Sequence, residues 1–216
     1  PAQHILGTAG FYGMDIAVDG RALIPRRETE QLVDRAKEIA GDRDVRVLDL
    51  GTGSGCIALA LAGALSDGSR VVASDVSAEA LALAAENAAK LELTYRVTFV
   101  ESDMFAALES EAGKVDILAA NLPYIRSDDI DGLMPEVRDH EPRLALDGGS
   151  DGLDAIRICV QRAPDMLSAE GWLLMEVGLG QAEAVADLMR GAGLAEVSVL
   201  RDAADIDRIV QGRRAA

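Results

Sequence analysis

The stretch that decides the fold is VRVLDLGTGSGC, residues 45–56. It opens with a short run of apolar and β-branched residues, which is typical of a buried strand. A turn containing Gly51, Gly53 and Gly55 follows, and apolar residues then recur at helical spacing. Glycines allow a sharp bend and a close approach of ligand to the main chain, and a helix N-terminus offers unpaired N–H groups. The stretch therefore predicts the strand–turn–helix entry of a nucleotide-type binding site.

The pattern of this turn separates several kinds of site. A phosphate-binding loop would need Gly-Lys-Ser or Gly-Lys-Thr, which does not follow here. The dinucleotide fingerprint ends in a small residue, where this chain has Cys56. What remains is a Gly-x-Gly-x-Gly turn, which is common in proteins that bind S-adenosylmethionine. The structural alternative is a turn that serves only to join strand and helix.

Composition favours one cytoplasmic domain without a membrane partner. The chain has 216 residues, 49% of them apolar, and contains neither a run of membrane-spanning length nor a secretory signal. The cysteines, Cys56 and Cys159, are far apart and fall on apolar helix faces, so we expect reduced thiols. His4 and His140 are too isolated to indicate a metal site, and none is predicted.

Charge argues against direct binding of nucleic acid. Twenty-one basic and 37 acidic residues give a formal charge of −16, whereas phosphate contacts need a basic face. The segment from Glu101 to Asp151 holds thirteen acidic and four basic residues. This segment forms a solvated acidic surface, or else it attracts a positively charged ligand, such as a basic protein partner or a sulfonium cation.

The first 26 residues predict a hairpin and linker. Residues 11–18 and 21–24 flank Asp19-Gly20, which is a strong turn signal. The second predicted unit, residues 27–216, begins with a helix whose apolar residues run from Leu32 to Ala40 and end at Gly41.

Strands and helices then alternate. Strands are expected at 45–50, 70–74, 96–101, 115–120 and 172–177, helices at 56–65, 78–91, 152–167 and 181–191, and a closing hairpin at 195–200 and 206–210. The segment 121–151 is rich in loops. The pattern predicts an α/β fold with a mostly parallel, seven-stranded, Rossmann-like sheet and a C-terminal antiparallel hairpin. Ligands of such sheets lie beyond the C-terminal strand ends, which collects Asp49, Gly51, Asp75, Asp103 and Asn121 at one edge.

Three residues near this edge, Asp75, Asp103 and Met104, suit an adenosine cofactor. Asp75 ends the second strand, where a carboxylate can accept both ribose hydroxyls, although a helix cap is the alternative. Asp103 and Met104 follow the third strand, where an adenine ring would lie. Asp103 could accept from the adenine amino group. Met104 could pack on the ring or simply fill the core.

The tetrapeptide Asn121-Leu122-Pro123-Tyr124 ends the fourth strand. A planar amide or aromatic amine is a poor nucleophile because its lone pair is delocalised. The Asn121 side-chain oxygen and the Leu122 carbonyl could accept its N–H protons, Pro123 would stiffen the turn, and the Tyr124 ring could pack on a flat group. An ordinary turn leaving a strand is the structural alternative.

These motifs together resemble the catalytic domain of the HemK/PrmC family of protein-(glutamine-N5) methyltransferases, which modify peptide-chain release factors. The resemblance covers nearly the whole chain. Its residues are Phe11-Tyr12-Gly13, LIPRRETE (23–30), DLGTGSGC (49–56), NLPYI (121–125), EPRLAL (141–146), Gly148-Gly149 and Asp151-Gly152-Leu153. The glycine turn is generic to methyltransferases, whereas LIPRRETE and EPRLALDGG are far more specific.

The resemblance implies a class I methyltransferase that uses S-adenosylmethionine and releases S-adenosylhomocysteine. It implies cofactor contacts at Gly51, Thr52, Gly53, Ser54, Gly55, Asp75, Met104 and Asn121. Asp103 joins this set because of its position after the third strand. Contacts with the substrate amide would fall on Asn121, Leu122, Pro123 and Tyr124. Arg26 or Glu30 could orient the substrate, and the implied partner is a release factor.

Two departures from the family pattern keep alternatives open. Leu122 replaces a proline, so the tetrapeptide also looks like that of rRNA adenine-N6 dimethylases, although the net charge and LIPRRETE oppose that interpretation. The family has a small N-terminal helical domain that helps to dock the release factor. We expect this chain to lack it, which puts substrate recognition in question. A glutamine methyltransferase acting on a ribosomal protein, a non-catalytic cofactor-binding module and an NAD enzyme are further alternatives.

Overall fold

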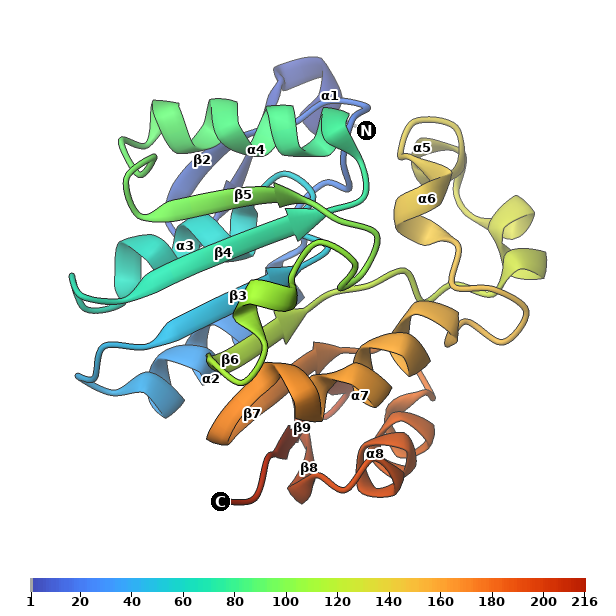
Figure 1. Ribbon diagram of the computed structural model, residues 1–216. Coiled ribbons are helices and arrows are strands. Elements are labelled where there is room, and N and C mark those ends of the chain that lie inside the picture. Colours follow the sequence, from blue (N-terminus) through green and yellow to red (C-terminus); the bar gives the residue numbers. More distant parts are fainter. Residues whose placement is uncertain (1) are drawn as a thin grey trace.

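The computed structural model describes residues 2–216 as a three-layer α/β fold (Figure 1). Seven strands form one sheet in the order β5-β4-β3-β6-β7-β9-β8. They are β3 (Arg46–Leu50), β4 (Arg70–Asp75), β5 (Val97–Glu101), β6 (Val115–Ala120), β7 (Leu167–Glu176), β8 (Ala195–Arg201) and β9 (Asp207–Arg213). β9 is antiparallel to both of its neighbours, and the first five strands in chain order are parallel. The predicted mostly parallel sheet with a closing antiparallel hairpin is confirmed.

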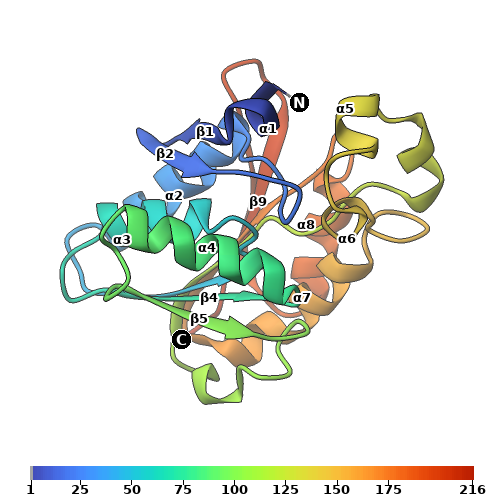
Figure 2. The same cartoon turned by 90° about the horizontal axis from the view of Figure 1, so that it is seen from above.

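Helices cover both faces of the sheet, and Figure 2 shows α3 and α4 together on one side of β4 and β5. The helices are α1 (Ala2–Leu6), α2 (Glu30–Ala40), α3 (Cys56–Ala64), α4 (Ala78–Lys90), α5 (Pro135–Arg138), α6 (Arg143–Leu146), α7 (Asp154–Met166) and α8 (Ala182–Gly191). Short 3-10 turns lie at Arg27–Thr29, Glu109–Glu111 and Ser127–Gly132. Of the helices described, none has the length and apolarity needed to cross a membrane.

The core forms on both faces because the central strands are apolar throughout. Val47, Leu48 and Leu118 are fully buried, as expected for parallel strands covered by helices on either side. One apolar cluster joins the sheet to α2, α3 and the N-terminal strands, and the other joins it to α7 and α8. The segment 121–151, predicted as loop, carries α5 and α6 and lies beyond the arrowheads of β4–β6 in Figure 1.

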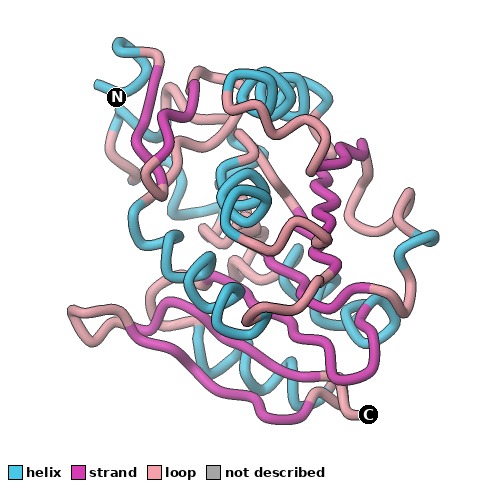
Figure 3. The backbone as a smooth tube through the Cα atoms, turned by 90° about the vertical axis from the view of Figure 1, so that its left-hand side faces the viewer, coloured by secondary structure: helices cyan, strands magenta, loops and turns pink. Residues whose placement is uncertain are grey.

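The N-terminal hairpin is real, but its predicted turn was wrong. β1 (Thr8–Phe11) and β2 (Met14–Ala17) pair around Tyr12-Gly13, apart from the larger sheet (Figure 3, near the N label). Tyr12 and Gly13 have φ values of 51° and 75°, the positive pair that a two-residue hairpin turn requires. Asp19 instead accepts from the Arg21 backbone N–H, so its side chain stabilises a local bend after β2.

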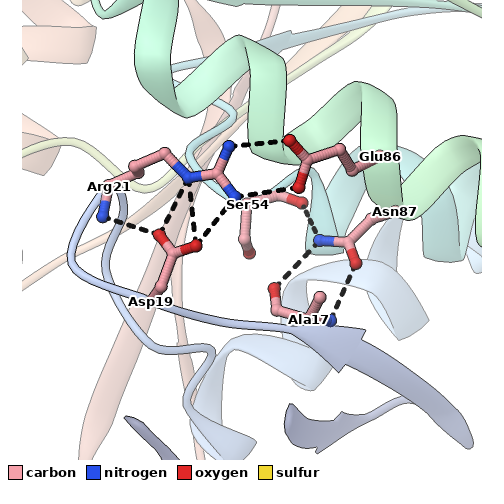
Figure 4. Close-up of polar contacts among 6 residues, drawn as sticks. All are labelled: Ala17, Asp19, Arg21, Ser54, Glu86 and Asn87. Atoms are coloured by element: carbon pink, nitrogen blue, oxygen red, sulfur yellow. Dashed lines mark hydrogen bonds and ion pairs between the residues drawn. The ribbon is translucent and has the colours of Figure 1, made fainter. Parts of the chain in front are cut away.

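A buried amide fixes the hairpin to the rest of the fold. Asn87 of α4 accepts from Ala17 N at 2.7 Å and donates to Ala17 O at 3.1 Å and to Ser54 O at 3.0 Å. Arg21 adds an ion pair with Asp19 and with Glu86 of α4 (Figure 4). The end of the hairpin, the glycine turn and α4 therefore meet at one side chain.

Gly55 is required where the turn enters α3. Its φ is +83°, and a Cβ there would lie 3.0 Å from the Ala84 Cβ. We expect Gly55→Ala to lower the free energy of unfolding by about 2 kcal/mol, from backbone strain and overpacking. Denaturant titration measures this change. Gly63→Ala is the control, because Gly63 is exposed inside α3 and its Cβ would meet only Leu93 at 3.9 Å. That variant should gain about 0.5–1 kcal/mol; equal behaviour of the two variants would contradict the strain at Gly55.

Candidate active site

The site lies where the strand order reverses. β3 is flanked by β4 on one side and by β6 on the other, which makes its C-terminal end the switch point of the sheet. A cavity of about 490 Å³ opens there, within the range typical of small-molecule sites. Its walls come from the glycine turn, the ends of β4 and β6, the segment 21–29 and parts of 142–158.

The glycine turn is held by the neighbouring strand and presents its backbone to the cavity. Gly51 N and Thr52 N both donate to Ser74 O at 2.8 Å, and Gly53 N donates to the Asp75 carboxylate at 2.9 Å. A Cβ at Gly51 would lie 3.0 Å from Leu122 Cδ2, so glycine allows the two strand ends to pack closely.

Asp49 braces the turn from below. The carboxylate is fully buried and accepts from the Thr52 hydroxyl at 2.7 Å and from Ala58 N at 3.1 Å, while its Oδ1 has no partner within residues 2–216. Burial raises the pKa of Asp49 to about 7, and the charge of Asp75 adds to the rise. Cys56, next to the turn, has its pKa raised to about 12 by burial, so it is a thiol at neutral pH.

The predicted adenosine end is assembled in the cavity. Asp75, Asp103 and Met104 all line it. Asp75 Oδ1 also accepts from Ser77 N at 2.9 Å, while Ser77 itself caps α4, so the carboxylate is held by backbone N–H groups on two sides. Met104 has a φ of +48°, and its bend is fixed because Ser102 Oγ donates to Met104 O and accepts from Ala107 N.

Most of the predicted amide-binding tetrapeptide reaches the same cavity. Asn121, Leu122 and Pro123 line it. Tyr124 is not among the lining residues; its carbonyl accepts from Gln181 at 2.9 Å, and its ring packs against Gly178. Burial and the nearby Glu176 raise the pKa of Tyr124, so its hydroxyl stays neutral.

The two candidate orienting residues separate. Arg26 lines the cavity and donates to Glu141 at 2.5 Å, while the other oxygen of that buried carboxylate accepts from Ile24 N. Glu30 lies elsewhere, where it accepts from Tyr12 N at 2.8 Å. Arg143 pairs with Asp147. The two most specific stretches of the sequence, LIPRRETE and EPRLAL, are thus joined by Arg26 and Glu141.

Sequence reasoning missed Glu176 and gave Thr29 no function. Glu176 ends β7 and is 5% exposed, and Thr29 is 2% exposed beside Asn121. Burial raises the pKa of Glu176, and a hydrogen bond from Thr29 opposes the rise. Glu176 could have been found, because it is a charged residue near the C-terminal end of the strand predicted at 172–177, the same end of the sheet at which Asn121 follows its strand. The contact of Thr29 with β7 spans too much sequence for any local pattern to reveal it.

The sequence of this chain is similar to those of known methyltransferases. Residues 47–140 match a family described as a methyltransferase domain. The release factor glutamine methyltransferases of Geobacter sulfurreducens and Cereibacter sphaeroides are each 45% identical over 99% of this chain, which spans 73% and 74% of their lengths. The chain belongs to the release factor glutamine methyltransferase family.

A solved structure agrees with that assignment. The release-factor-specific protein-(glutamine-N5) methyltransferase from Alicyclobacillus acidocaldarius is 29% identical, with a TM-score of 0.54 over 89% of this chain and 95% of that chain. The predicted family, the class I methyltransferase fold and the enzyme class are confirmed. An NAD enzyme, kept open by the sequence, is excluded by this membership.

Asp49 should give the stability of the fold a measurable pH dependence. Because its folded-state pKa is raised from 3.8 to about 7, its protonated form stabilises the fold below pH 3.8, and that contribution is lost as pH rises to about 7. The loss amounts to at most about 4 kcal/mol at 1.36 kcal/mol for each pKa unit. We expect the free energy of unfolding of wild type, measured relative to Asp49→Asn, to fall across this window. Parallel profiles of the two proteins would show that Asp49 is already ionised in the folded state.

Proposed function

We propose that this protein transfers a methyl group from S-adenosylmethionine to the side-chain nitrogen of a glutamine in a peptide-chain release factor, within its Gly-Gly-Gln loop. The observation that carries the proposal is the position of Asn121-Leu122-Pro123 on the wall of the cavity that the glycine turn and Asp75 also line. Cofactor and amide substrate would therefore meet in one enclosed space.

The residues of the cavity fit this cofactor. Asp75 would accept from the ribose hydroxyls, Asp103 from the adenine amino group, and Met104 would pack on the ring. The backbone of residues 51–55 would contact the methionine part of the cofactor. The orphaned, buried Asp49 Oδ1 is an acceptor beneath that turn, where the cofactor's amino group would add positive charge. S-adenosylmethionine supplies an electrophilic methyl group on a sulfonium sulfur.

This chain would hold the glutamine amide by accepting hydrogen bonds from its N–H groups. As the new N–CH₃ bond forms and the S–CH₃ bond of the sulfonium breaks, one N–H proton of the glutamine is released to solvent. We assign acceptance of these hydrogen bonds to the Asn121 side-chain oxygen and the Leu122 carbonyl, with Pro123 fixing the turn. Tyr124, whose ring packs against Gly178 and does not line the cavity, would support this turn rather than contact the amide. Alignment of nitrogen with the methyl group can contribute roughly 7–11 kcal/mol. Each well-placed acceptor adds on the order of 3 kcal/mol. Cys56, held as a thiol, takes no part as a nucleophile.

The proposed reaction also indicates the protein's partner, its location in the cell and the roles of two regions of the chain. A release factor as substrate implies a cytoplasmic protein, and the charge of −16 disfavours a nucleic-acid substrate. Arg26, paired with Glu141 on the cavity wall, is proposed to orient the incoming loop, and Glu30 to support it indirectly through the hairpin turn at Tyr12. We also propose that residues 1–26 act as a linker segment and 27–216 as the catalytic domain.

Asp75→Ala should weaken cofactor binding without removing the fold. The variant loses the ribose acceptor and the partner of Gly53 N. We expect the Kd for S-adenosylmethionine, measured by calorimetry, to rise about 100-fold, which corresponds to about 2.7 kcal/mol. Asp103→Ala, on the same wall, should raise it less, because adenine keeps its stacking. An unchanged Kd in Asp75→Ala would place the ribose elsewhere.

Mass spectrometry of a release factor incubated with the protein and S-adenosylmethionine tests the reaction itself. One added methyl group on the glutamine of the Gly-Gly-Gln loop is the expected result. Asn121→Ala should lower kcat by about 100-fold or more, while the Kd of the cofactor changes little. Near-normal turnover in Asn121→Ala would remove the role given to Asn121.

A second set of substrates tests the alternatives. Wild type should leave a ribosomal protein and an adenine-containing RNA unmethylated under the same conditions. Methylation of either one, with the release factor untouched, would replace the proposed substrate.

A further inference from the structure

The side chain of Asn121 can face the cavity in two ways. Its amide has one end with two N–H donors and one end with an acceptor oxygen, and the two ends have nearly the same shape. Only the oxygen can accept a hydrogen bond from the N–H groups of a substrate amide. Neighbouring groups must therefore decide which end faces the substrate.

The structure brings two such neighbours to Asn121. Ala120 of β6 pairs in register with Met175 of β7, so the residues that follow them, Asn121 and Glu176, leave adjacent strands side by side. Thr29, from the 3-10 turn Arg27–Thr29, contacts both. The Nδ2 atom of Asn121 lies 3.5 Å from Thr29 Oγ1. The Thr29 hydroxyl also lies near the Glu176 carboxyl, where it acts as a donor that lowers the pKa of Glu176.

The chemistry of these groups gives the hydrogen-bond chain one direction. When the Glu176 carboxyl is ionised it can only accept, so the single hydroxyl hydrogen of Thr29 then turns to Glu176. The Thr29 oxygen then has only lone pairs to offer, and it receives the Nδ2 end of Asn121. Within residues 2–216 no group donates to Asn121 Oδ1, which leaves it available to the cavity.

We propose that Thr29 and Glu176 are positioning residues, which act through Asn121 by holding its amide with the acceptor oxygen toward the substrate. The inference deepens the proposed function and rests on it for the identity of the substrate. Glu176 is buried and is not among the residues that line the cavity, and one of its oxygens has no partner among the described residues. Thr29 does line the cavity, so its test must separate an effect through Asn121 from a direct contact with the substrate.

The charges around Glu176 bear on this direction. Arg208 and Arg26 favour its ionised form, whereas burial and Glu28 oppose it. Tyr124, whose hydroxyl is neutral, is near enough for the charge of Glu176 to contribute to its raised pKa. When Glu176 takes up a proton, Thr29 is no longer forced to donate to it, and the direction of the chain is lost. Because its pKa is raised, this occurs at a higher pH than for an ordinary glutamate.

The first test compares three variants in the methyl-transfer assay. Thr29→Val has nearly the same shape but offers no lone pair, and it should lower kcat by about tenfold to a hundredfold while leaving the Kd for S-adenosylmethionine unchanged. Thr29→Ser keeps the hydroxyl and should restore most of the activity. Ser69→Ala removes another buried, hydrogen-bonded hydroxyl at the opposite edge of the sheet, and it should leave kcat unchanged.

A double-mutant cycle shows whether Thr29 acts through Asn121. In single-turnover reactions, Thr29→Val should have little effect when Asn121 is already alanine. Independent, additive losses would overturn the inference, as would equal losses in Thr29→Val and Ser69→Ala. Glu176→Gln should flatten the acid side of the plot of kcat against pH, since its amide does not titrate. An unchanged acid side would overturn the part assigned to Glu176.

A spectroscopic measurement separates this inference from the proposed function. The side-chain NH₂ resonances of Asn121, assigned by their loss in Asn121→Ala, should shift in Thr29→Val and Glu176→Gln and stay in place in Ser69→Ala. Should wild type methylate no glutamine, the proposed function fails while this readout still decides the hydrogen-bond direction. Resonances that do not respond to Thr29→Val would overturn the inference whatever the substrate.

Discussion

The amide of Asn87 is the interaction on which the geometry of the cavity depends. It uses both of its donors and its acceptor on backbone groups of Ala17 and Ser54, and it is completely buried. Loss of this side chain would leave buried backbone groups without partners, which costs more than a typical hydrogen bond contributes. The segment 21–29, which forms one wall of the cavity, starts directly from this junction. Helix α4 thus places a wall of the site as well as covering the sheet.

Acidic side chains gather at the C-terminal ends of the parallel strands, near the cavity. Asp49 and Glu176 both have raised pKa values because they are buried, and Asp75 adds to the rise at Asp49. A cationic ligand in the cavity would favour their ionised forms, so its binding would be linked to proton release. A sulfonium cofactor with an amino group has this charge. The buried carboxyl groups therefore favour binding of a cationic cofactor, while their burial lowers the stability of the fold when they are ionised.

Local patterns were sufficient to predict the sheet and one half of the site. Apolar strands, the glycine turn and the polar residues at strand ends are each encoded within about ten residues, and the rule for parallel sheets brings them together. The hairpin turn was wrong because Asp19 uses its side chain on Arg21, while Tyr12-Gly13 takes up positive φ values. Arg26–Glu141 and Thr29–Glu176 join segments more than a hundred residues apart. No periodicity in the sequence encodes such pairs.

Leu122 shows how the fold accommodates one departure from the family pattern. Its side chain is buried and lies against Gly51, where a Cβ would come within 3.0 Å of Cδ2. The side chain is therefore matched to the glycine turn, whereas the role proposed for this position belongs to its carbonyl. Proline and leucine both provide a carbonyl, and neither side chain supplies a proton acceptor. Because leucine and proline leave the carbonyl at this position unchanged, the identity of residue 122 alone does not distinguish a glutamine amide from an adenine amine as the substrate group.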